Sequence, residues 1–591
     1  MPVIDFNTKV QVGNNLAKAV YRGTTVINSN PRSILFSSSE PGIWFDPSDL
    51  STLFQDAAGT TPVTTPGQTV ALALDKSKGL VLGPELVTNG DFASDTVWAK
   101  GSNWTIANGA ASVSGQTATT YLSQAILTTG KTYEVIVDAS GSSLGRIQLG
   151  NTGTNYQLVS GRNRFVGVCA GNTNLIVTAL VGNSFSIDNI SVRELPGNHA
   201  TQATAAARPT YGIEPEGGRR NLLNMTDNLA GWTLQATPDV TSDGTLGGEP
   251  AFRLTDNDTT LWEALLHPYT ANTLRSGNYV VSIRIKKETT ASSAASFRVD
   301  MYTGGPTEWA GAVINPISGD VITGTAWSYG NRVTSVDDMG TYWQVTMRFT
   351  VSSGHYISSF QIFPAHFNLT MSNVGVTNVG SNTWAAPQLE VGSTPTAYQR
   401  VTSQYNITEV GKNTLHYIQF DGVDDFLVTS TIAPGTDKAQ VFAGVRKLSD
   451  AARATLVELT SGAGNRFFVD APGGANPSYA FGSQGLAGLS WAGVTSGYPA
   501  PDTAVITGIG DISADISTLR RNGIQIATNA LDQGSGVYQT QPLYIGRRGG
   551  TSQPFNGRIY GLIVRFGANL NAVQVNQIEK FVGFKTGVTI P

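Results

Sequence analysis

Cysteine, charge and long apolar runs are all scarce in this chain of 591 residues. Cys169 is the only cysteine, so the chain forms neither an intrachain disulfide nor a metal site built from several cysteines. It lies in the apolar run 165–170 and is expected to be a small buried hydrophobic residue. Charged residues make up 14% of the sequence, whereas ordinary soluble proteins have about 25%. The net charge is only −4, and the Arg-Arg pairs at 219–220, 520–521 and 547–548 are expected to be solvated turns. Because phosphate binding needs clustered Lys and Arg, we expect no nucleic-acid partner.

No apolar stretch is long enough to span a bilayer, and residues 1–9 lack the continuous apolar core of a secretory signal. Ser, Thr, Asn and Gly replace charge, with 66 glycines in the chain, so the expected surface resembles that of extracellular adhesins. A virion protein, made in the host cytoplasm without a signal peptide and released by lysis, reconciles this surface with the missing export signal. We therefore expect a virion location and no membrane insertion.

Short runs that alternate apolar and polar residues fill nearly the whole chain. Residues 279–285 and 342–349 are examples, and clusters of Gly, Asn, Ser and Asp separate such runs at close spacing. This pattern is typical of antiparallel β-sandwiches. Only residues 571–582 have helical spacing, with Asn571 as the expected N-cap and Gly583 as the expected end. The predicted fold class is all-β, with several antiparallel sandwiches of the jelly-roll kind and one short C-terminal helix.

Residues 84–195 read as a self-contained unit. The opening segment at 84–92 (Pro-Glu-Leu-Val-Thr-Asn-Gly-Asp-Phe) and the closing segment at 185–195 (Phe-Ser-Ile-Asp-Asn-Ile-Ser-Val-Arg-Glu-Leu) resemble the first and last strands of jelly-roll carbohydrate-binding modules. In that family the two strands run side by side, as a domain inserted in a loop requires. The resemblance implies a structural calcium near these ends, with Asp91 and Asp188 as carboxylate ligands. The alternative is that Asp91 caps a turn and Asp188 bonds to backbone.

The same unit carries three aromatic side chains that are candidates for stacking on sugar rings: Trp98, Trp104 and Tyr121. Aromatic residues also dominate sandwich cores, and core packing is the better interpretation for at least one of the two tryptophans. Trp98 is expected to be the exposed ring because its neighbours Thr96 and Lys100 are polar.

A second unit covers residues 213–412. Its closing segment at 385–398 (Ala-Ala-Pro-Gln-Leu-Glu-Val-Gly-Ser-Thr-Pro-Thr-Ala-Tyr) resembles the last strand of carbohydrate-binding-like jelly rolls in phage tail and fibre proteins. Trp262 and Trp309 are the candidate sugar-binding rings here. Trp309 is flanked by Pro, Thr, Glu and Gly, and is expected on an exposed loop.

The remaining pieces join into one interrupted domain, formed by residues 41–83, 196–212 and 413–591. Their most telling segments are Gly-Ile-Trp-Phe-Asp-Pro at 42–47, His-Tyr-Ile-Gln-Phe-Asp-Gly-Val-Asp-Asp-Phe at 416–426, and the two late segments at 543–548 and 555–564. Read without the two units between them, they resemble the concanavalin-A-like, or laminin-G-like, sandwiches of phage structural proteins. The resemblance implies that strands around Trp44, Phe420 and Ile559 lie in one sandwich.

Asp421, Asp424 and Asp425 invite a metal or catalytic interpretation. A tight turn, in which Gly422 supplies the flexible backbone and the carboxylates bond to nearby amides, is the favoured alternative. Residues 1–40 stand outside the predicted sandwiches and resemble short β-units at the N-termini of phage fibre proteins. We interpret them as an arm that docks on other virion proteins; the alternative is a frayed leader.

The resemblance implies a bacteriophage virion structural protein, a fibre or spike that displays sugar-binding-like sandwiches for attachment to host-surface glycans. The alternative is a non-adhesive decoration protein of the head, neck or tail. A polysaccharide-degrading enzyme is a third interpretation, but the sequence has no Gly-x-Ser-x-Gly elbow and no His-Glu-x-x-His zinc motif. We expect no catalysis and no required cofactor beyond the structural calcium. By analogy with phage fibres we expect a homotrimer, although no heptad stretch supports it.

Overall fold

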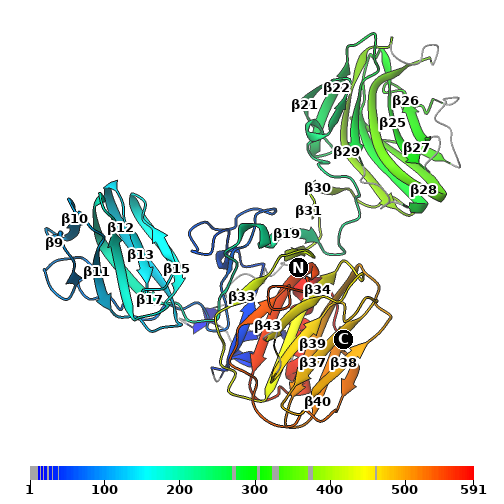
Figure 1. Cartoon of the computed structure of the whole chain (residues 1–591). Coiled ribbons are helices and arrows are strands. Elements are labelled where there is room, and N and C mark those ends of the chain that lie inside the picture. Colours follow the sequence, from blue (N-terminus) through cyan, green and yellow to red (C-terminus); the bar gives the residue numbers. More distant parts are fainter. Residues whose placement is uncertain are drawn as a thin grey trace. The chain divides into compact units, whose positions relative to one another are not determined.

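The computed structural model of the chain is almost entirely β-sheet (Figure 1). Two compact units make it up: residues 1–212 together with 415–591, and residues 213–414. Antiparallel sheets dominate both units and a short helix ends the chain, which confirms the predicted fold class. None of the described helices is long and apolar enough to cross a membrane. The structure describes residues 11–12, 15–16, 19–22, 25–29, 31–37, 39–268, 275–302, 307–322, 332–370, 377–459, 462 and 464–591.

One sandwich of the first unit, here called the host sandwich, joins strands from both ends of the chain. β5 (Gly42–Phe45) pairs antiparallel with β43 (Asn556–Phe566), and β32 (Thr414–Asp421) pairs with the same strand. Figure 1 shows the blue N-terminal segment beside red β43. The partners along β43 are buried and apolar: Trp44 lies opposite Ile563, and Ile418 lies opposite Ile559.

The host sandwich has two sheets. In the first, β32 and β43 are followed by β34, β39, β40 and β41; in the second, the order is β38-β37-β36-β35-β42-β33-β18-β7-β6. The further strands are β34 (Lys438–Lys447), β39 (Asp502–Asp511), β40 (Ile516–Arg521), β41 (Ile524–Asn529), β38 (Leu489–Val494), β37 (Tyr479–Gln484), β36 (Arg466–Asp470), β35 (Thr455–Leu459), β42 (Leu543–Ile545), β33 (Leu427–Thr429), β18 (Ala200–Thr201), β7 (Leu72–Ala73) and β6 (Leu53–Phe54).

Two further sandwiches lie, in sequence, between neighbouring strands of the host sandwich. β7 and β18 pair with each other, with Ala73 opposite Ala200, although the whole first sandwich lies between them along the chain. β19 (Thr210–Pro215) and β32 are likewise neighbours in their sheet, and the second sandwich separates them in sequence.

The first sandwich, which lies between β7 and β18 in the sequence, consists of two five-stranded sheets that face each other. Their strand orders are β15-β12-β17-β10-β9 and β14-β13-β16-β11-β8. Its core contains Cys169, which is buried as expected. Its two ends lie together, because Gly83 N donates to Glu194 O at 2.9 Å and Leu86 N donates to Val192 O at 3.0 Å. The strands are β8 (Ala99–Lys100), β9 (Trp104–Ala107), β10 (Ala110–Val113), β11 (Thr120–Ala125), β12 (Thr132–Ser143), β13 (Arg146–Leu149), β14 (Asn155–Gln157), β15 (Gly161–Val168), β16 (Asn174–Ala179) and β17 (Ser184–Glu194).

The second sandwich is built around the long strand β28, which pairs with β23, β24, β25 and β27. Its ends also meet: Glu216 N donates to Asn413 O at 2.8 Å, and β31 pairs with β19 at Ile213 and Asn406. The strands are β20 (Thr233–Gln235), β21 (Asp239–Leu246), β22 (Glu249–Asp256), β23 (Ala264–Pro268), β24 (Arg275–Lys286), β25 (Ser293–Tyr302), β26 (Glu308–Ile314), β27 (Val333–Asp338), β28 (Tyr342–Asn368), β29 (Gly380–Val391), β30 (Gln399–Ser403) and β31 (Asn406–Glu409).

The C-terminal helix α2 (Ala572–Thr586) begins as predicted. The Asn571 side chain accepts from Gln574 N and the Gln574 side chain accepts from Asn571 N, a capping box. The expected end at Gly583 is wrong, because this glycine is buried inside the helix, where a larger side chain would clash with Ile590. The helix ends at Gly587, whose φ of 70° is left-handed.

The N-terminal segment differs from the prediction that residues 1–40 stand apart. Leu35, at the end of α1 (Pro31–Leu35), and Phe36 are buried in a core with the C-terminal helix. Arg565 donates to Leu35 O at 2.7 Å, so this turn is bound to the host sandwich. Residues 1–10 lie outside the described residues. The strands before α1 are β1 (Gln11–Val12), β2 (Asn15–Leu16), β3 (Ala19–Arg22) and β4 (Thr25–Ser29), paired as two antiparallel hairpins.

Candidate functional site

The two candidate tryptophans of the first sandwich are core residues. Trp98 is only 7% exposed, and Trp104 only 5%. Trp98 Nε1 donates to Asn89 O at 3.1 Å, and its ring packs on Phe92. The prediction that Trp98 is an exposed sugar-binding ring is therefore wrong. The loop before it coils back through left-handed residues, among them Val97 with a φ of 63°, which turns the ring inward despite its polar neighbours.

Trp104 also departs from the sugar-binding prediction. It shares the inward row of β9 with Ile106, and its ring meets Phe185 edge-on at 5.6 Å. Tyr121 is different, since 51% of this residue is exposed. It occupies an outward position of β11, so one of the three predicted rings of this sandwich faces solvent.

Asp91 and Asp188 make local hydrogen bonds. Asp91 Oδ1 accepts from Ala93 N at 3.4 Å, and Asp188 Oδ1 accepts from Asn189 N at 2.6 Å. Across the sheet, Asp188 lies opposite Asp138, and Asn189 donates to both carboxylates. The described residues place neither Asp91 nor Asp188 in a group of three acidic, His or Cys ligands. The calcium at these residues stays a prediction.

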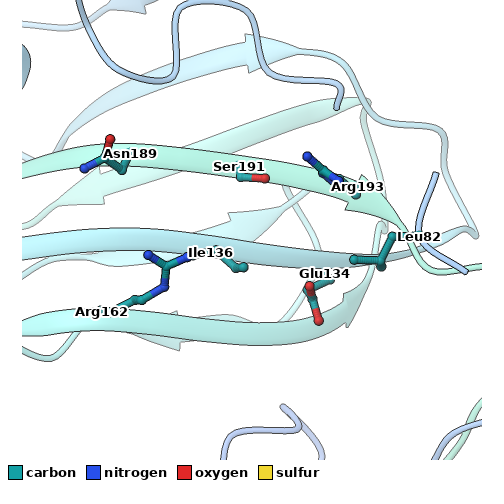
Figure 2. Close-up of a pocket in the computed structure, with 7 residues that line it drawn as sticks. All are labelled: Leu82, Glu134, Ile136, Arg162, Asn189, Ser191 and Arg193. Carbon is teal, nitrogen blue, oxygen red and sulfur yellow. The ribbon is translucent and has the colours of Figure 1, made fainter. Parts of the chain in front are cut away.

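A polar groove of about 560 Å³ lies on the outer face of the β15-β12-β17 sheet (Figure 2). Ile136 forms its floor on β12, and Arg162 reaches toward it from β15. A register shift between β12 and β17, next to Ile136, accompanies the left-handed Asn189 at one end of the groove. Such bulges often re-aim side chains at binding surfaces. The lining residues are Leu82, Glu134, Ile136, Arg162, Asn189, Ser191 and Arg193.

Most charges of this groove are paired. Glu85 accepts from Ser191 Oγ at 2.5 Å and lies 3.3 Å from Arg193 Nε. Burial alone would raise the pKa of Glu85, but the hydrogen bonds from Ser191 and from the Val192 amide lower it. Glu134 forms an ion pair with Arg164 at 2.5 Å. The groove therefore presents hydrogen-bonding groups of mixed charge and no aromatic platform.

In the second sandwich, the predicted rings Trp262 and Trp309 are brought together around Arg298. The guanidinium carbon of Arg298 lies 5.8 Å from the centre of Trp262 and 5.5 Å from that of Trp309. It also lies 5.1 Å from the ring of Phe363. Both tryptophans are partly exposed. Trp309 is not on a loop, as predicted; it lies in β26 opposite Asp300.

The alternation of β25 explains why these side chains gather on the side of the sheet opposite the main core, where both tryptophans pack against a second buried cluster that includes Phe363. Phe297, Val299 and Met301 point into the main core. Arg298 and Asp300, at the positions between, therefore point to the opposite face. The sequence prediction missed both residues, although polar residues at alternate positions of an otherwise apolar strand were a usable signal.

Below the rings lies a buried polar layer. Asp300 forms an ion pair with Arg298 at 2.8 Å and accepts from Ser359 Oγ at 2.8 Å and Gln361 Nε2 at 2.5 Å. Burial raises the pKa of Asp300 and lowers that of Arg298. Gln361 Oε1 and Ser296 Oγ are buried without a hydrogen-bond partner among the described residues. Buried polar atoms of this kind are costly unless a ligand or water satisfies them.

The acidic segment of the host sandwich forms the predicted turn. Asp421 Oδ1 accepts from the amides of Val423 and Asp424, and Gly422 has a left-handed φ of 78°. Asp425 Oδ2 accepts from Asp421 N at 3.0 Å. One ligand atom from each of the three carboxylates lies within 4.8 Å of the others. Burial, followed by repulsion from Asp421, raises the pKa of Asp425 to about 7, so a proton relieves the crowding near neutral pH.

The three Arg-Arg pairs are not solvated turns, contrary to the prediction. Arg220 lies 2.8 Å from Glu409, and Arg520 lies 2.8 Å from Glu579, whose side chain is fully buried. Arg548 lies 3.8 Å from the buried Glu458. In a chain with few charges, each of these arginines lies beside a buried carboxyl group.

No protein-family model matches the chain, and no curated protein matches it in sequence. Among solved structures, the chain is similar to the tandem CBM22-1–CBM22-2 domain of Paenibacillus barcinonensis Xyn10C, with 9% identity, 52% of this chain and 98% of that chain covered, and a TM-score of 0.19. It is also similar to domains LG4-5 of the mouse laminin alpha1 chain, with 12% identity, 56% and 92% covered, and a TM-score of 0.21. Likenesses this weak carry no weight for function.

Proposed function

We propose that this chain is a structural protein of a bacteriophage virion, a fibre or spike whose sandwiches bind glycans on the host surface. The low charge and the polar surface support this function. So does the resemblance of the two inner segments to carbohydrate-binding jelly rolls and of the outer pieces to concanavalin-A-like sandwiches. The nested strand order supports a display role, because each inserted sandwich begins and ends at neighbouring points of the host sandwich.

The single observation that carries the sugar-binding proposal is the face formed by Trp262, Trp309 and Arg298. Sugar rings offer apolar C–H faces to aromatic rings and hydroxyl groups to polar side chains. Here two partly exposed indoles flank a guanidinium. Gln361 lies opposite Arg298 on the neighbouring strand, and its buried side-chain oxygen Oε1 has no hydrogen-bond partner among the described residues. A few fixed polar groups between apolar walls are what orient a small ligand.

Binding of the full-length protein to host cells and to a glycan array tests this proposal. Trp262→Ala and Trp309→Ala should each weaken binding by about tenfold, the equivalent of roughly 1.4 kcal/mol. Phe584→Ala is the matched control, because Phe584 is a 49% exposed ring on the C-terminal helix and should leave binding unchanged. Wild-type affinity in both tryptophan variants would contradict the assignment of this face.

Absence of any binding by the wild-type chain would favour the alternative, a non-adhesive decoration protein of the head, neck or tail. We also propose that the chain is not an enzyme. Incubation with host polysaccharide should release no reducing ends above the level of a boiled sample. A time-dependent increase would restore the enzyme interpretation.

We further propose that the segment before α1 joins the virion, and that the particle carries the chain as a homotrimer. Deletion of residues 1–30 should leave a soluble protein that no longer enters particles. Deletion of residues 1–40 is the informative comparison, because it also removes the buried Leu35 and Phe36 and should lower the melting temperature. Incorporation of the shorter deletion would contradict the docking proposal, and sedimentation of the purified chain as a monomer would contradict the trimer.

A further inference from the structure

The second sheet of the host sandwich carries an aromatic and arginine-rich face that the proposed function does not use. In one row across the sheet, Glu458 pairs with Phe468, Phe468 with Gly482, and Gly482 with Trp491. The adjacent residues on the same two strands, Phe467 and Phe481, point the other way and stack on each other in the interior. The row that ends at Trp491 therefore lies on the outer face of the sheet.

Two glycines shape this face. A side chain at Gly482 would collide with the ring of Phe468, and one at Gly493 would collide with Nε1 of Trp491. The indole of Trp491 thus lies down over its own strand, with its ring at 83° to that of Phe468 and 5.8 Å away. Trp491 is 37% exposed at the edge strand β38 (Figure 1). The face offers an indole whose position is fixed by the strands beneath it.

Two arginines lie over these rings, and a third is paired with Glu458 of the same row. The guanidinium carbon of Arg453 lies 4.8 Å from the centre of Trp491 and 5.0 Å from that of Phe468. The guanidinium carbon of Arg466 lies 6.0 Å from the centre of the Phe468 ring. Arg548 Nε lies 3.8 Å from Glu458 Oε2, and Glu458 belongs to the same row. Arg453 is held by the fully buried Asp470, to which its Nε donates at 2.7 Å.

Positive charge is in excess on this face. Three guanidinium groups face the two carboxylates of Glu458 and Asp470. Burial raises the pKa of Glu458 to about 7 and that of Asp470 to about 6, so the two carry less than two full negative charges near neutral pH. Burial, followed by repulsion from Arg548, lowers the pKa of Arg466. An added anion would relieve this repulsion.

We propose that this face of the host sandwich binds an acidic polysaccharide, by stacking a uronic-acid ring on Trp491 with its carboxylate against Arg453 and Arg466. Planar guanidinium groups match carboxylate geometry and stack on rings. Binding here is independent of the Trp262 and Trp309 face, because it uses different strands and requires charge on the ligand.

Titration calorimetry of the full-length protein with oligogalacturonate tests the proposal, and the methyl ester of the same oligomer is the matched ligand without charge. The acid should bind at least about tenfold more tightly than its ester at low salt, and the difference should shrink as salt is added. Trp491→Ala and Arg466→Gln should each weaken binding of the acid by about tenfold. Trp262→Ala and Phe584→Ala should leave it unchanged.

The outcomes separate this proposal from the proposed function. Equal binding of acid and ester, or wild-type binding by both Trp491→Ala and Arg466→Gln, would overturn the acidic site. Loss of binding in Trp262→Ala but not in Trp491→Ala would also overturn it and place the acid on the second sandwich. Arg466→Gln keeps an uncharged hydrogen-bonding side chain at a partly exposed position, so it stays informative if Trp491→Ala fails to fold, which a thermal melt reveals.

Discussion

The first and second sandwiches carry the same sequence signals and use them in opposite ways. Each has tryptophans near short polar segments and a jelly-roll-like closing strand. In the first sandwich, Trp98 and Trp104 fill the core, and the outer sheet face is a polar groove. In the second, Trp262 and Trp309 are partly exposed around Arg298, on the side of the sheet opposite the main core. The difference teaches that a ring's role follows from the row of the strand that it occupies, rather than from the polarity of its neighbours.

The largest expected effect separates core rings from face rings. Trp104→Ala should destabilise the first sandwich by about 3–5 kcal/mol, because it leaves a cavity beside Phe185. Trp262→Ala should cost the second sandwich about 1 kcal/mol or less, since its ring is partly exposed. Urea titrations followed by hydrogen exchange of peptides from each sandwich measure both values. Equal losses of stability in the two variants would contradict the distinction between the core ring of Trp104 and the partly exposed ring of Trp262.

One carboxyl group in each sandwich should also contribute to stability with an opposite dependence on pH. In the second, Glu263 is 2% exposed and its amide donates to Asp256. Burial, with repulsion from Asp256, raises the pKa of Glu263 from 4.5 to about 7. The folded sandwich then holds a proton on Glu263 that the unfolded chain releases, so the contribution of Glu263 to stability should fall as pH rises from about 4.5 to 7. His267 and His366, whose pKa values burial lowers to about 4, contribute with the opposite sign.

Glu263→Gln removes this titration, so the difference in stability between the variant and wild type should change by about 1–2 kcal/mol over that range. Melting of this sandwich at pH 5, 6, 7 and 8, with peptides of the first sandwich as the internal reference, measures the change. A difference in stability between wild type and Glu263→Gln that stays constant with pH would contradict the raised pKa of Glu263.

The first sandwich should show a smaller effect of the other sign. The pKa of Glu85 is lowered by its hydrogen bonds with Ser191 and the Val192 amide. Its contribution to stability is therefore present above pH 4.5 and lost as pH falls through the lowered value. Glu85→Gln should cost about 0.5–1 kcal/mol at pH 7 and almost nothing at pH 3. If Glu85→Gln lost the same stability at pH 3 as at pH 7, the charge of Glu85 would play no part in this contact.

The smallest effect is expected at the groove of the first sandwich. Arg162 is exposed, so Arg162→Ala should change stability by less than about 0.5 kcal/mol. Its effect on glycan binding should be at most about threefold, below that of Trp262→Ala, because one polar side chain without a ring platform contributes less than 1 kcal/mol. If Arg162→Ala reduced binding in the glycan array by more than this, the principal sugar contact would lie in the first sandwich and not in the second.

The period-two pattern was enough to predict the all-β class, because alternation is a local property of each strand. The buried Cys169 followed in the same way from its apolar neighbours. The orientation of Trp98 did not, since it depends on a coiled loop with left-handed residues such as Val97, which sequence polarity does not encode. The Arg-Arg pairs were misassigned for a related reason: Arg520 meets Glu579 only after α2 packs on β39 and its neighbours, in the sheet that also contains β40.

The site in the second sandwich was predictable in part. Trp262 and Trp309 were chosen for their type, and the structure places both beside Arg298. That arginine and Asp300 could have been found from the alternation within β25, whereas Phe363 and Gln361 come from another strand and need the register of β25 with β28. Register is set by long-range pairing, which a single sequence does not reveal.

The paired ends of the first sandwich have a mechanical consequence. Its entry and exit are joined to each other, since Gly83 N donates to Glu194 O, and they leave toward the adjacent strands β7 and β18. Tension applied along the host chain would pass across these short contacts and leave the hydrophobic core of the inserted sandwich unloaded. A binding surface attached in this way keeps its shape while the scaffold is pulled.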